Sequence, residues 1–242
     1  MVDGSEADSS AASVPDSSPI VRAAPEWAER VAASLLEIGA VELRPADPFT
    51  WTSGLVAPIY CDNRLTIAYP SVRRTLRDGF VSMIDDAALQ PATIAGTATA
   101  GIPHAAWLAE AVDEPMAYVR DTAKDHGTGS KIEGKVRSED EVLLVEDLIS
   151  TGGSALDAVA SLRAVGATVR AVLAIFTYQL DGAARAFRDD GVHCRVLTDF
   201  RTLVDVAHQQ GRLGDADRAV LRTWRADPEA WSVDHGGTRP NA

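Results

Sequence analysis

Two successive strand–helix–strand patterns constrain the fold of this chain more than any other feature. The first joins an apolar strand at 92–96, a helical pattern at 102–112 and a strand at 115–120. The second repeats this order at 141–147, 154–167 and 168–176. Units of this kind place parallel strands side by side through right-handed crossovers. The sequence therefore predicts an α/β fold, a doubly wound and mostly parallel sheet flanked by helices, with ligands at the carboxyl ends of the strands.

Apolar spacing outside these units predicts further elements. Residues 24–40 and 70–84 have the spacing of amphipathic helices, and residues 49–64 combine Gly, Pro and aromatic residues as in a turn with short strands. The apolar face of the first helix consists of Trp27, Val31, Leu35 and Ile38. We expect one large domain at 24–226, because the length allows it and no internal repeat divides the chain.

The two ends of the chain have a different composition. Residues 1–23 are acidic and rich in Ser and Ala, with no positively charged flank and no long apolar stretch. They predict a disordered tail, neither a signal peptide nor a membrane span, and a cytoplasmic location. Residues 227–242 are expected to form a C-terminal tail. Cys61 and Cys194 lack metal-ligand spacing and are expected to be buried thiols.

Charge is distributed unevenly along the chain. The 242 residues include 35 acidic and 23 basic ones, a net charge of −12, which argues against non-specific binding of nucleic acid. The three lysines, Lys124, Lys131 and Lys135, all lie within residues 123–135. If the ligand is a small polyanion, this segment is where cations are concentrated against the acidic background.

The segment VEDLISTGGSA at 145–155 is the strongest candidate for a ligand site. A strand ends here in Glu146 and Asp147, and a turn rich in Gly and hydroxyl groups then opens a helix. Such a turn can hold a phosphate, because its N–H groups converge at the positive end of the helix dipole. Carboxylates beside a phosphate would repel it unless they bind another part of the ligand, and a sugar diol is such a part. The pattern therefore favours a phosphorylated pentose, the alternative being an ordinary turn with a Ser cap.

Four segments resemble a known family. VLLVEDLISTGGSA resembles the signature of the type I phosphoribosyltransferases, which bind 5-phosphoribosyl 1-diphosphate. FTWTSGLVAPIYCDNR, IAGTATAGIPHAA and MAYVRDTAKDHGTGSKIEGK are similar, in this order, to segments of the orotate phosphoribosyltransferase family. The resemblance extends from about residue 30 to about residue 225. It implies transfer of the 5-phosphoribosyl group to orotate, giving orotidine 5′-monophosphate and diphosphate in pyrimidine biosynthesis.

The resemblance also implies an architecture and a set of partners. It adds to the doubly wound sheet a small N-terminal hood, mainly residues 24–65, and a mobile catalytic loop at 121–136. It implies Mg²⁺ bound mainly through the diphosphate, with no protein metal site. It further implies a homodimer in which the loop of one subunit closes over the diphosphate of the other and excludes water, with no nucleic acid or membrane as a partner.

The family positions imply roles for individual residues. The catalytic candidates are Lys124, Asp125 and His126, with Asp125 at the position of a general acid. The candidates for binding 5-phosphoribosyl 1-diphosphate are Arg120, Lys124, His126, Glu146, Asp147, Leu148, Ile149, Ser150, Thr151, Gly152, Gly153 and Ser154. The candidates for orotate are Ser150, Tyr60, Cys61 and Arg64. For Arg64, a surface ion pair is an equally good interpretation. The other histidines, His104, His193, His208 and His235, are expected to be structural or exposed.

The chain departs from some members of the family. Lysines that some members carry are replaced here by Thr52, Ala100, Asp121 and Thr122. An arginine that receives the substrate carboxylate in some members is absent near Tyr178. The carboxylate of orotate is therefore left without an evident anchor.

Two other functions compete with this interpretation. Residues 129–135 match the spacing of a nucleotide-binding Gly-x4-Gly-Lys loop, but Val136 occupies the required Ser/Thr position and no apolar strand directly precedes the segment. A transcriptional regulator with the same fold is the second alternative. It would be expected to carry a DNA-binding helix-turn-helix and a basic patch, whereas residues 1–23 are short and acidic.

Overall fold

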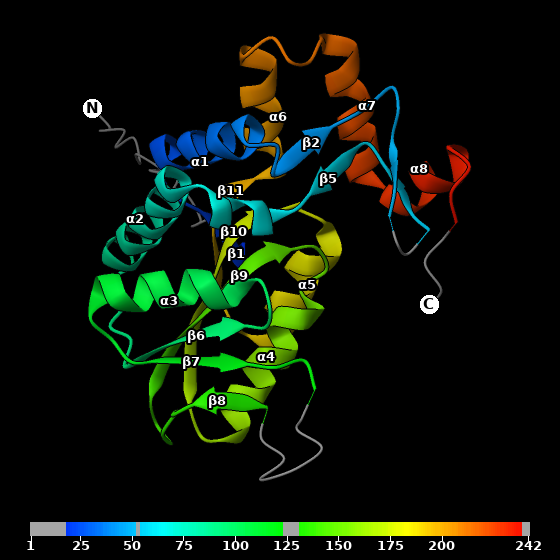
Figure 1. Ribbon diagram of the computed structural model, residues 1–242. Helices are drawn as coiled ribbons and strands as arrows, with labels where there is room; N and C mark the ends of the chain where they lie inside the picture. The colour runs from blue at the N-terminus through cyan, green and yellow to red at the C-terminus, as the bar shows by residue number, and fades with distance from the viewer. Residues whose placement is uncertain (1–17, 52–53, 123–130, 239–242) are drawn as a thin grey trace, which may run out of the picture.

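The computed structural model describes residues 18–51, 54–122 and 131–238. Within these ranges the chain forms a seven-stranded sheet in the order β1-β11-β10-β9-β6-β7-β8 (Figure 1). The pairs are parallel except β7 with β8, which is antiparallel. The strands are β1 (Ile20–Arg22), β6 (Thr93–Thr97), β7 (Met116–Val119), β8 (Ile132–Gly134), β9 (Glu141–Ile149), β10 (Thr168–Thr177) and β11 (Cys194–Asp199).

Helices cover both faces of this sheet, as the two strand–helix–strand units predict. One face packs against α1 (Pro25–Glu37), α2 (Pro70–Asp86) and α3 (Gly101–Val112), and the other packs against α4 (Gly153–Ala164) and α5 (Asp181–Asp190). Strand β9 illustrates the division, because Leu143 and Val145 point into the first layer while Val142 and Leu144 point into the second. Such continuous burial is typical of a central parallel strand. The predicted doubly wound α/β fold is confirmed.

A second, smaller layer lies over one end of the sheet. It contains the antiparallel pairs β2 (Val41–Leu43) with β5 (Ile59–Cys61) and β3 (Phe49–Thr50) with β4 (Val56–Ala57), followed by the 3-10 helix η1 (Asn63–Ala68). Three helices from the end of the chain lie beside it: α6 (Phe200–Gln209), α7 (Asp215–Ala226) and α8 (Pro228–Asp234). An aromatic cluster of Trp51, Tyr178 and Trp224 connects this layer to the end of β10.

The two expected tails are shorter than predicted. Residues 20–22 form β1, which pairs with β11 and completes one edge of the sheet. Residues 228–234 form α8, which contacts β4 and buries Trp231. The hydroxyl of Ser232 accepts a hydrogen bond from the Val56 N–H at 2.9 Å. The assignment of 227–242 to a tail is therefore wrong for its described part. Ser232 on α8 supplies the hydrogen-bond acceptor that the buried Val56 N–H requires, so this short segment packs against the rest of the fold.

Other boundaries also differ from the sequence predictions. Part of the predicted loop at 121–136 is strand β8, so the segment is not a loop throughout. Helix α1, which begins the predicted hood, packs on β11 and α6 and covers the sheet. Strand β9 continues to Ile149, two residues beyond the predicted end. No helix within the described ranges is long and apolar enough to cross a membrane.

Candidate active site

Two adjacent carboxylates lie near the carboxyl end of β9. The side chain of Glu146 is buried, whereas Asp147 is half-buried. Glu146 Oε1 accepts a hydrogen bond from the Asp147 N–H at 2.9 Å, and Glu146 Oε2 lies 3.4 Å from the hydroxyl of Ser154, which donates to it. The carboxylate of Glu146 is therefore fixed by the turn and helix that follow the strand, as well as by the strand itself.

Burial perturbs both carboxyl groups, and at Glu146 the charge of Asp147 adds to its effect. Burial, reinforced by the charge of Asp147, raises the pKa of Glu146 to about 8. Burial also raises the pKa of Asp147. These shifts indicate that the negative charge at this strand end is under-compensated among the described residues. Hydroxyl donors of a sugar, or a divalent cation, would relieve it, and hard oxygen donors suit Mg²⁺.

The turn after β9 has the backbone geometry of an anion cradle. Gly152 adopts a φ of +90°, in the left-handed region that favours glycine, and a Cβ there would lie 3.0 Å from the Phe187 ring. Helix α4 begins at Gly153, and the predicted residues Ser150 to Ser154 surround its N-terminus. The first N–H groups of a helix lack intrahelical partners and carry the positive end of its dipole. The turn can therefore bind a phosphate.

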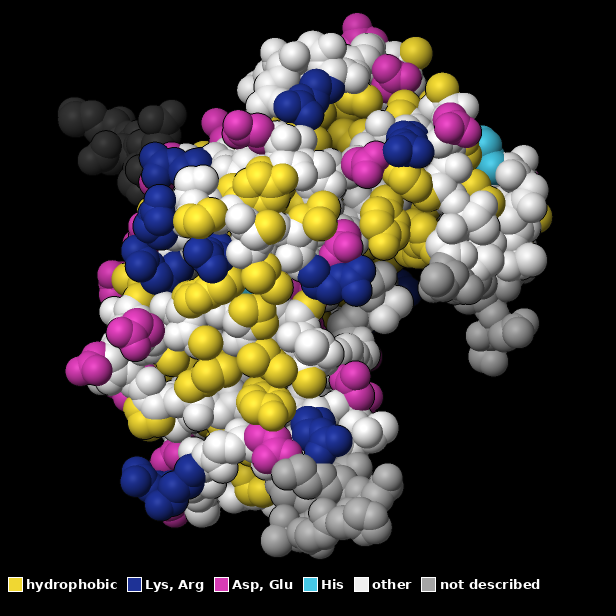
Figure 2. All heavy atoms as spheres, viewed as in Figure 1, with side chains coloured by type: hydrophobic (Ala, Val, Ile, Leu, Met, Phe, Trp, Pro, Cys, Tyr) yellow, Lys and Arg dark blue, Asp and Glu magenta, His cyan; other side chains and the backbone are white. Residues whose placement is uncertain are grey.

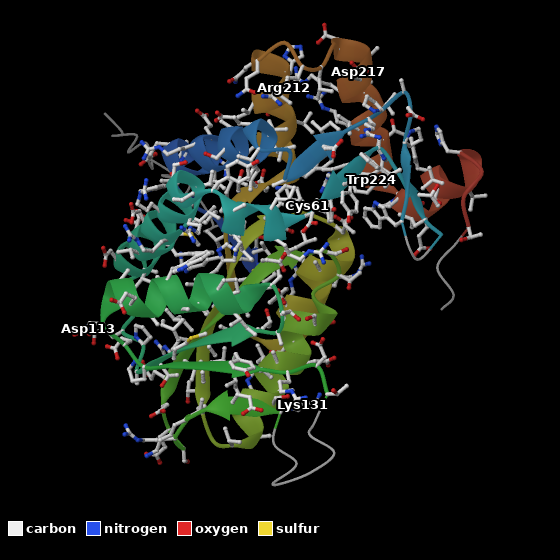
Figure 3. The ribbon with its side chains drawn as sticks, in the orientation of Figure 1. Cys61, Asp113, Lys131, Arg212, Asp217 and Trp224 are labelled. Carbon is white, nitrogen blue, oxygen red and sulfur yellow. The ribbon has the colours of Figure 1, made fainter. Side chains whose placement is uncertain are left out.

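A cleft of about 330 Å³ opens beside this turn. Figure 2 shows the molecule hollowed between the smaller layer and the carboxyl ends of the strands. The cleft is lined by Thr97, Val119, Arg120, Asp121, Lys131, Ser154, Asp157 and Ala158. Arg120 and Lys131 bring two cations to it, and Figure 3 labels Lys131, which directly precedes β8. Arg120 is also paired with Glu133, with 3.6 Å between Nη1 and Oε1.

Of the residues that line this cleft, only Arg120 and Ser154 were predicted as site residues, and three of the others carry polar side chains of interest: Thr97, Lys131 and Asp157. Thr97 ends β6, and its hydroxyl donates to the Val145 carbonyl at 3.2 Å. Asp157 lies on α4, one turn beyond Gly153. Lys131 belongs to the lysine cluster, which was the one available signal for it. The segment containing Thr97 also carries a cis peptide between Ala98 and Thr99.

The predicted orotate residues lie on the hood side of the site. Arg64 forms a bidentate ion pair with Asp62, with distances of 2.6 and 2.9 Å, and its side chain is 65% exposed. The surface ion pair considered for Arg64 is therefore present. Tyr60 is exposed, and Cys61 is half-buried. Burial, followed by the charges of Asp147 and Asp62, raises the pKa of the Cys61 thiol well above its usual value, so the thiol is neutral.

Asn63 connects the hood to the strand-end carboxylates, although sequence reasoning assigned it no role. Its side-chain amide donates to the Asp147 carbonyl at 2.7 Å, and the residue is 1% exposed. The hydrogen bond runs from η1 to β9, 84 positions apart in the sequence. Because this contact fixes the backbone at Asp147, it positions a predicted binding residue from outside the sheet.

The predicted catalytic residues Lys124, Asp125 and His126 lie outside the described residues. Within the described ranges, no group of three or more His, Cys, Asp or Glu side chains could hold a metal ion. His104 is buried beside Thr66, and burial lowers the pKa of His104 to about 4, so it is a neutral structural histidine.

Comparison with known proteins agrees with this geometry. The profile of the family described as a phosphoribosyl transferase domain matches residues 70–211. The orotate phosphoribosyltransferase of Bacillus caldolyticus is 51% identical over 201 residues, which are 83% of this chain and 97% of that relative. The orotate phosphoribosyltransferase of Enterococcus faecalis OG1RF is 46% identical over 204 residues, or 84% and 97% of the two chains.

A solved structure extends this comparison to the fold. The crystal structure of orotate phosphoribosyltransferase from Aeropyrum pernix has a TM-score of 0.66 and 29% identity, and the match covers 76% of this chain and 99% of that one. This chain belongs to the phosphoribosyltransferases, within the orotate phosphoribosyltransferase family.

Proposed function

We propose that the protein transfers the 5-phosphoribosyl group from 5-phosphoribosyl 1-diphosphate to orotate, as a step in pyrimidine nucleotide synthesis in the cytoplasm. The products are orotidine 5′-monophosphate and diphosphate. The observation that carries the proposal is the pair Glu146 and Asp147 next to the turn that opens α4, because this arrangement suits a ribosyl diol and a phosphate of one ligand. The relatives named above support orotate as the acceptor.

The chemistry breaks the bond between the anomeric carbon of the ribosyl group and the diphosphate oxygen. A bond then forms from that carbon to a ring nitrogen of orotate, and the proton that this nitrogen carried is released to the departing diphosphate or to solvent. Positive charge develops on the sugar and negative charge on the departing diphosphate, so each needs a partner of opposite sign. In this proposal the backbone and hydroxyls of residues 148–154 hold the 5-phosphate, while Glu146 and Asp147 bind the sugar hydroxyls and stabilise the positive charge.

The leaving group would be stabilised by cations. Arg120, at the cleft, is supported by its position beside Lys131. Lys124 and His126 are assigned to the diphosphate and Asp125 to general acid catalysis, by the family positions of the catalytic loop. Loop closure would also exclude water that could hydrolyse the activated sugar. Mg²⁺, bound mainly through diphosphate oxygens, supplies further charge neutralisation.

Orotate is proposed to bind between the hood and the strand ends. Ser150, Tyr60 and Cys61 are the assigned contacts. Arg64 is the assigned cationic contact for the substrate carboxylate, and its bidentate pairing with Asp62 would have to open for a bidentate contact with the substrate. The neutral thiol of Cys61 suits contact with a planar ring better than contact with a carboxylate.

We also propose a homodimer in which each catalytic loop serves the partner subunit. A surface formed by η1 and the adjacent helices α2 and α3 supports this assembly. Leu65, Ile67 and Tyr69 are between 39% and 43% exposed, which is unusual for large apolar side chains so close in sequence. On the adjacent helices, the Arg73 guanidinium lies 5.0 Å from the Trp107 ring centroid. Figure 2 shows apolar side chains gathered on this face of the molecule.

Loss of orotate absorbance tests the activity. Purified protein with Mg²⁺, orotate and 5-phosphoribosyl 1-diphosphate is expected to form orotidine 5′-monophosphate, and omission of Mg²⁺ should slow the reaction. Hypoxanthine and adenine should be poor acceptors, because the segment at 49–64 matches the pyrimidine enzyme. Tight binding of 5-phosphoribosyl 1-diphosphate without turnover would instead favour the regulator, and equal rates with a purine would refute the choice of base.

A further inference from the structure

A second cleft lies between α6 and α7, on the paired helices visible in Figure 1. Its volume is about 420 Å³, larger than the candidate active-site cleft, and the two clefts share no lining residue. It is lined by Phe200, Arg201, Val204, Asp205, Arg218, Arg222, Arg225 and Ala226. Four guanidinium groups thus face one carboxylate, in a protein whose net charge is −12.

The sequence of α7 creates this concentration of charge. Arg218, Arg222 and Arg225 are spaced at i, i+4 and i+7, so they form one stripe along the helix. The stripe flanks the face that buries Leu221 and Trp224. Arg201, in the first turn of α6, adds a fourth guanidinium next to the positive end of that helix's dipole. Similar charges at this spacing repel one another, so the arrangement costs stability unless an anion is bound.

Existing contacts compensate only part of this charge. Arg218 pairs with Asp205, and its Nε is buried without a hydrogen-bond partner. Arg225 donates to the main-chain carbonyl of Gln179. Within the described ranges, the side chains of Arg201 and Arg222 make no ion pair, and both residues are exposed. Two uncompensated cations and a partly compensated pair therefore remain available to a ligand.

We propose that this cleft is a second anion site, which binds a small polyphosphate either free or carried by a nucleotide. Guanidinium groups bind phosphate oxygens in a bidentate manner. A di- or triphosphate concentrates three or four negative charges within a volume that this cleft can hold, whereas a monocarboxylate would leave most of the guanidinium charge unmatched. Phe200, Val204 and Ala226 provide an apolar wall beside the cations.

Hydrogen bonds at Gln179 and at the preceding Tyr178 connect the cleft to the candidate active site. Gln179 accepts hydrogen bonds from both sides of the cleft, from the Arg201 N–H to its side chain at 3.1 Å and from Arg225 to its carbonyl. The preceding Tyr178 N–H donates to the Ile149 carbonyl, next to the phosphate turn, at 3.2 Å. A ligand that pulls on Arg201 or Arg225 would therefore act on a segment joined to the catalytic strand end.

Calorimetric titration without Mg²⁺ tests the proposal, with inorganic triphosphate and UTP as probes. Three proteins are compared: wild type, Arg201→Gln/Arg222→Gln, and Arg137→Gln, which removes an exposed arginine from the turn between β8 and β9, outside the cleft. Any binding to the active-site cleft should be common to all three. Wild type and Arg137→Gln should show an additional site whose affinity is at least about tenfold weaker in the double variant.

Both substituted side chains of the double variant are exposed, and their removal relieves like-charge repulsion, so without added probe the variant should unfold at a temperature no lower than wild type and its phosphoribosyl transfer should match wild type. Tighter binding of UTP than of triphosphate would show that the site recognises a nucleotide, and equal binding would show that it recognises the polyphosphate alone. Either result supports the site. Isotherms that coincide in all three proteins, or the absence of a second site in wild type, would overturn the proposal.

Discussion

Glu146 and Asp147 are the carboxylates from which the sequence predicted a sugar site. Their burial disfavours the ionised form of both side chains, and a ligand that donates hydrogen bonds to them would offset this cost. Glu146 is 6% exposed, and its pKa of about 8 follows first from burial and then from the adjacent charge. In the unliganded protein near neutral pH, Glu146 therefore retains its proton to a large extent. Donors that approach these carboxylates, such as ribosyl hydroxyls, would favour the ionised form and couple ligand binding to proton release.

The raised pKa of Glu146 predicts a pH-dependent stability. Between its ordinary pKa of 4.5 and about 8, the folded state holds a proton that the unfolded state has lost, so the free energy of unfolding falls as pH rises through this window. The slope is at most about 1.4 kcal/mol per pH unit. Thermal unfolding between pH 5 and 9 should show a flatter profile for Glu146→Gln than for wild type. The exposed Glu110→Gln serves as control, and parallel profiles for all three proteins would contradict the assignment.

Asp147→Asn should affect ligand binding more than folding. The residue is half-buried at a strand end, so the variant should melt within a few degrees of wild type. A neutral amide is a weaker acceptor than a carboxylate, so the KM for 5-phosphoribosyl 1-diphosphate should rise and kcat should fall, together by roughly tenfold or more. Steady-state kinetics beside Asp189→Asn, an exposed control on α5, measure this. Kinetics equal to those of the control would exclude the role assigned to Asp147.

At the scale of elements, helices α3 and α4 both begin with a glycine, Gly101 and Gly153, but the space around the two glycines differs. A Cβ at Gly101 would lie 2.4 Å from the Val145 carbonyl oxygen, whereas a Cβ at Gly153 would find its nearest atom at 4.0 Å. Gly101→Ala should therefore destabilise the protein by about 1–3 kcal/mol, because α3 must move away from β9. Gly153→Ala should leave stability almost unchanged. Denaturant unfolding of both variants checks this, and equal losses would show that α3 accommodates the methyl group.

The central elements could be predicted from sequence because their signals are local. A buried strand followed by a helical stripe, as at 141–167, identifies itself within one window. The sequence did not reveal β1, because three residues at the end of a Ser-rich segment become a strand only through pairing with β11. Helix α8 was missed for a similar reason, since Trp231 and Ser232 acquire their function from contact with β4.

The candidate site likewise has one part that the sequence predicts and another that only the fold brings together. The carboxylates and the phosphate turn lie in one continuous segment, so the sequence shows them together. Thr97 and Lys131 reach the cleft from different parts of the chain, and only the sheet order β9-β6-β7-β8 places their elements on the same side of β9. Asn63 contacts Asp147 through the packing of η1 on β9, which no periodicity indicates.

At the scale of the whole molecule, the proposed dimer predicts complementation between two inactive chains. Lys124→Ala should reduce turnover by about 10²–10³-fold if the lysine stabilises the leaving group. Under conditions that exchange subunits, mixing Lys124→Ala with Asp147→Asn should regenerate one intact site per heterodimer, because loop and carboxylates would come from different chains. The check is activity after mixing, with heterodimers demonstrated separately. Activity that stays at the level of the two variants would mean that the loop serves its own subunit.

The pairing of β1 with β11 also bears on how the chain folds during its synthesis. Ile20 pairs with Cys194, so β1 is synthesised long before the strand with which it pairs. Contacts between such distant segments form slowly. Until they form, β11 presents an unpaired edge that another nascent chain could join. Three residues that contribute little to the core therefore protect the edge of the sheet at β11 from pairing with another chain.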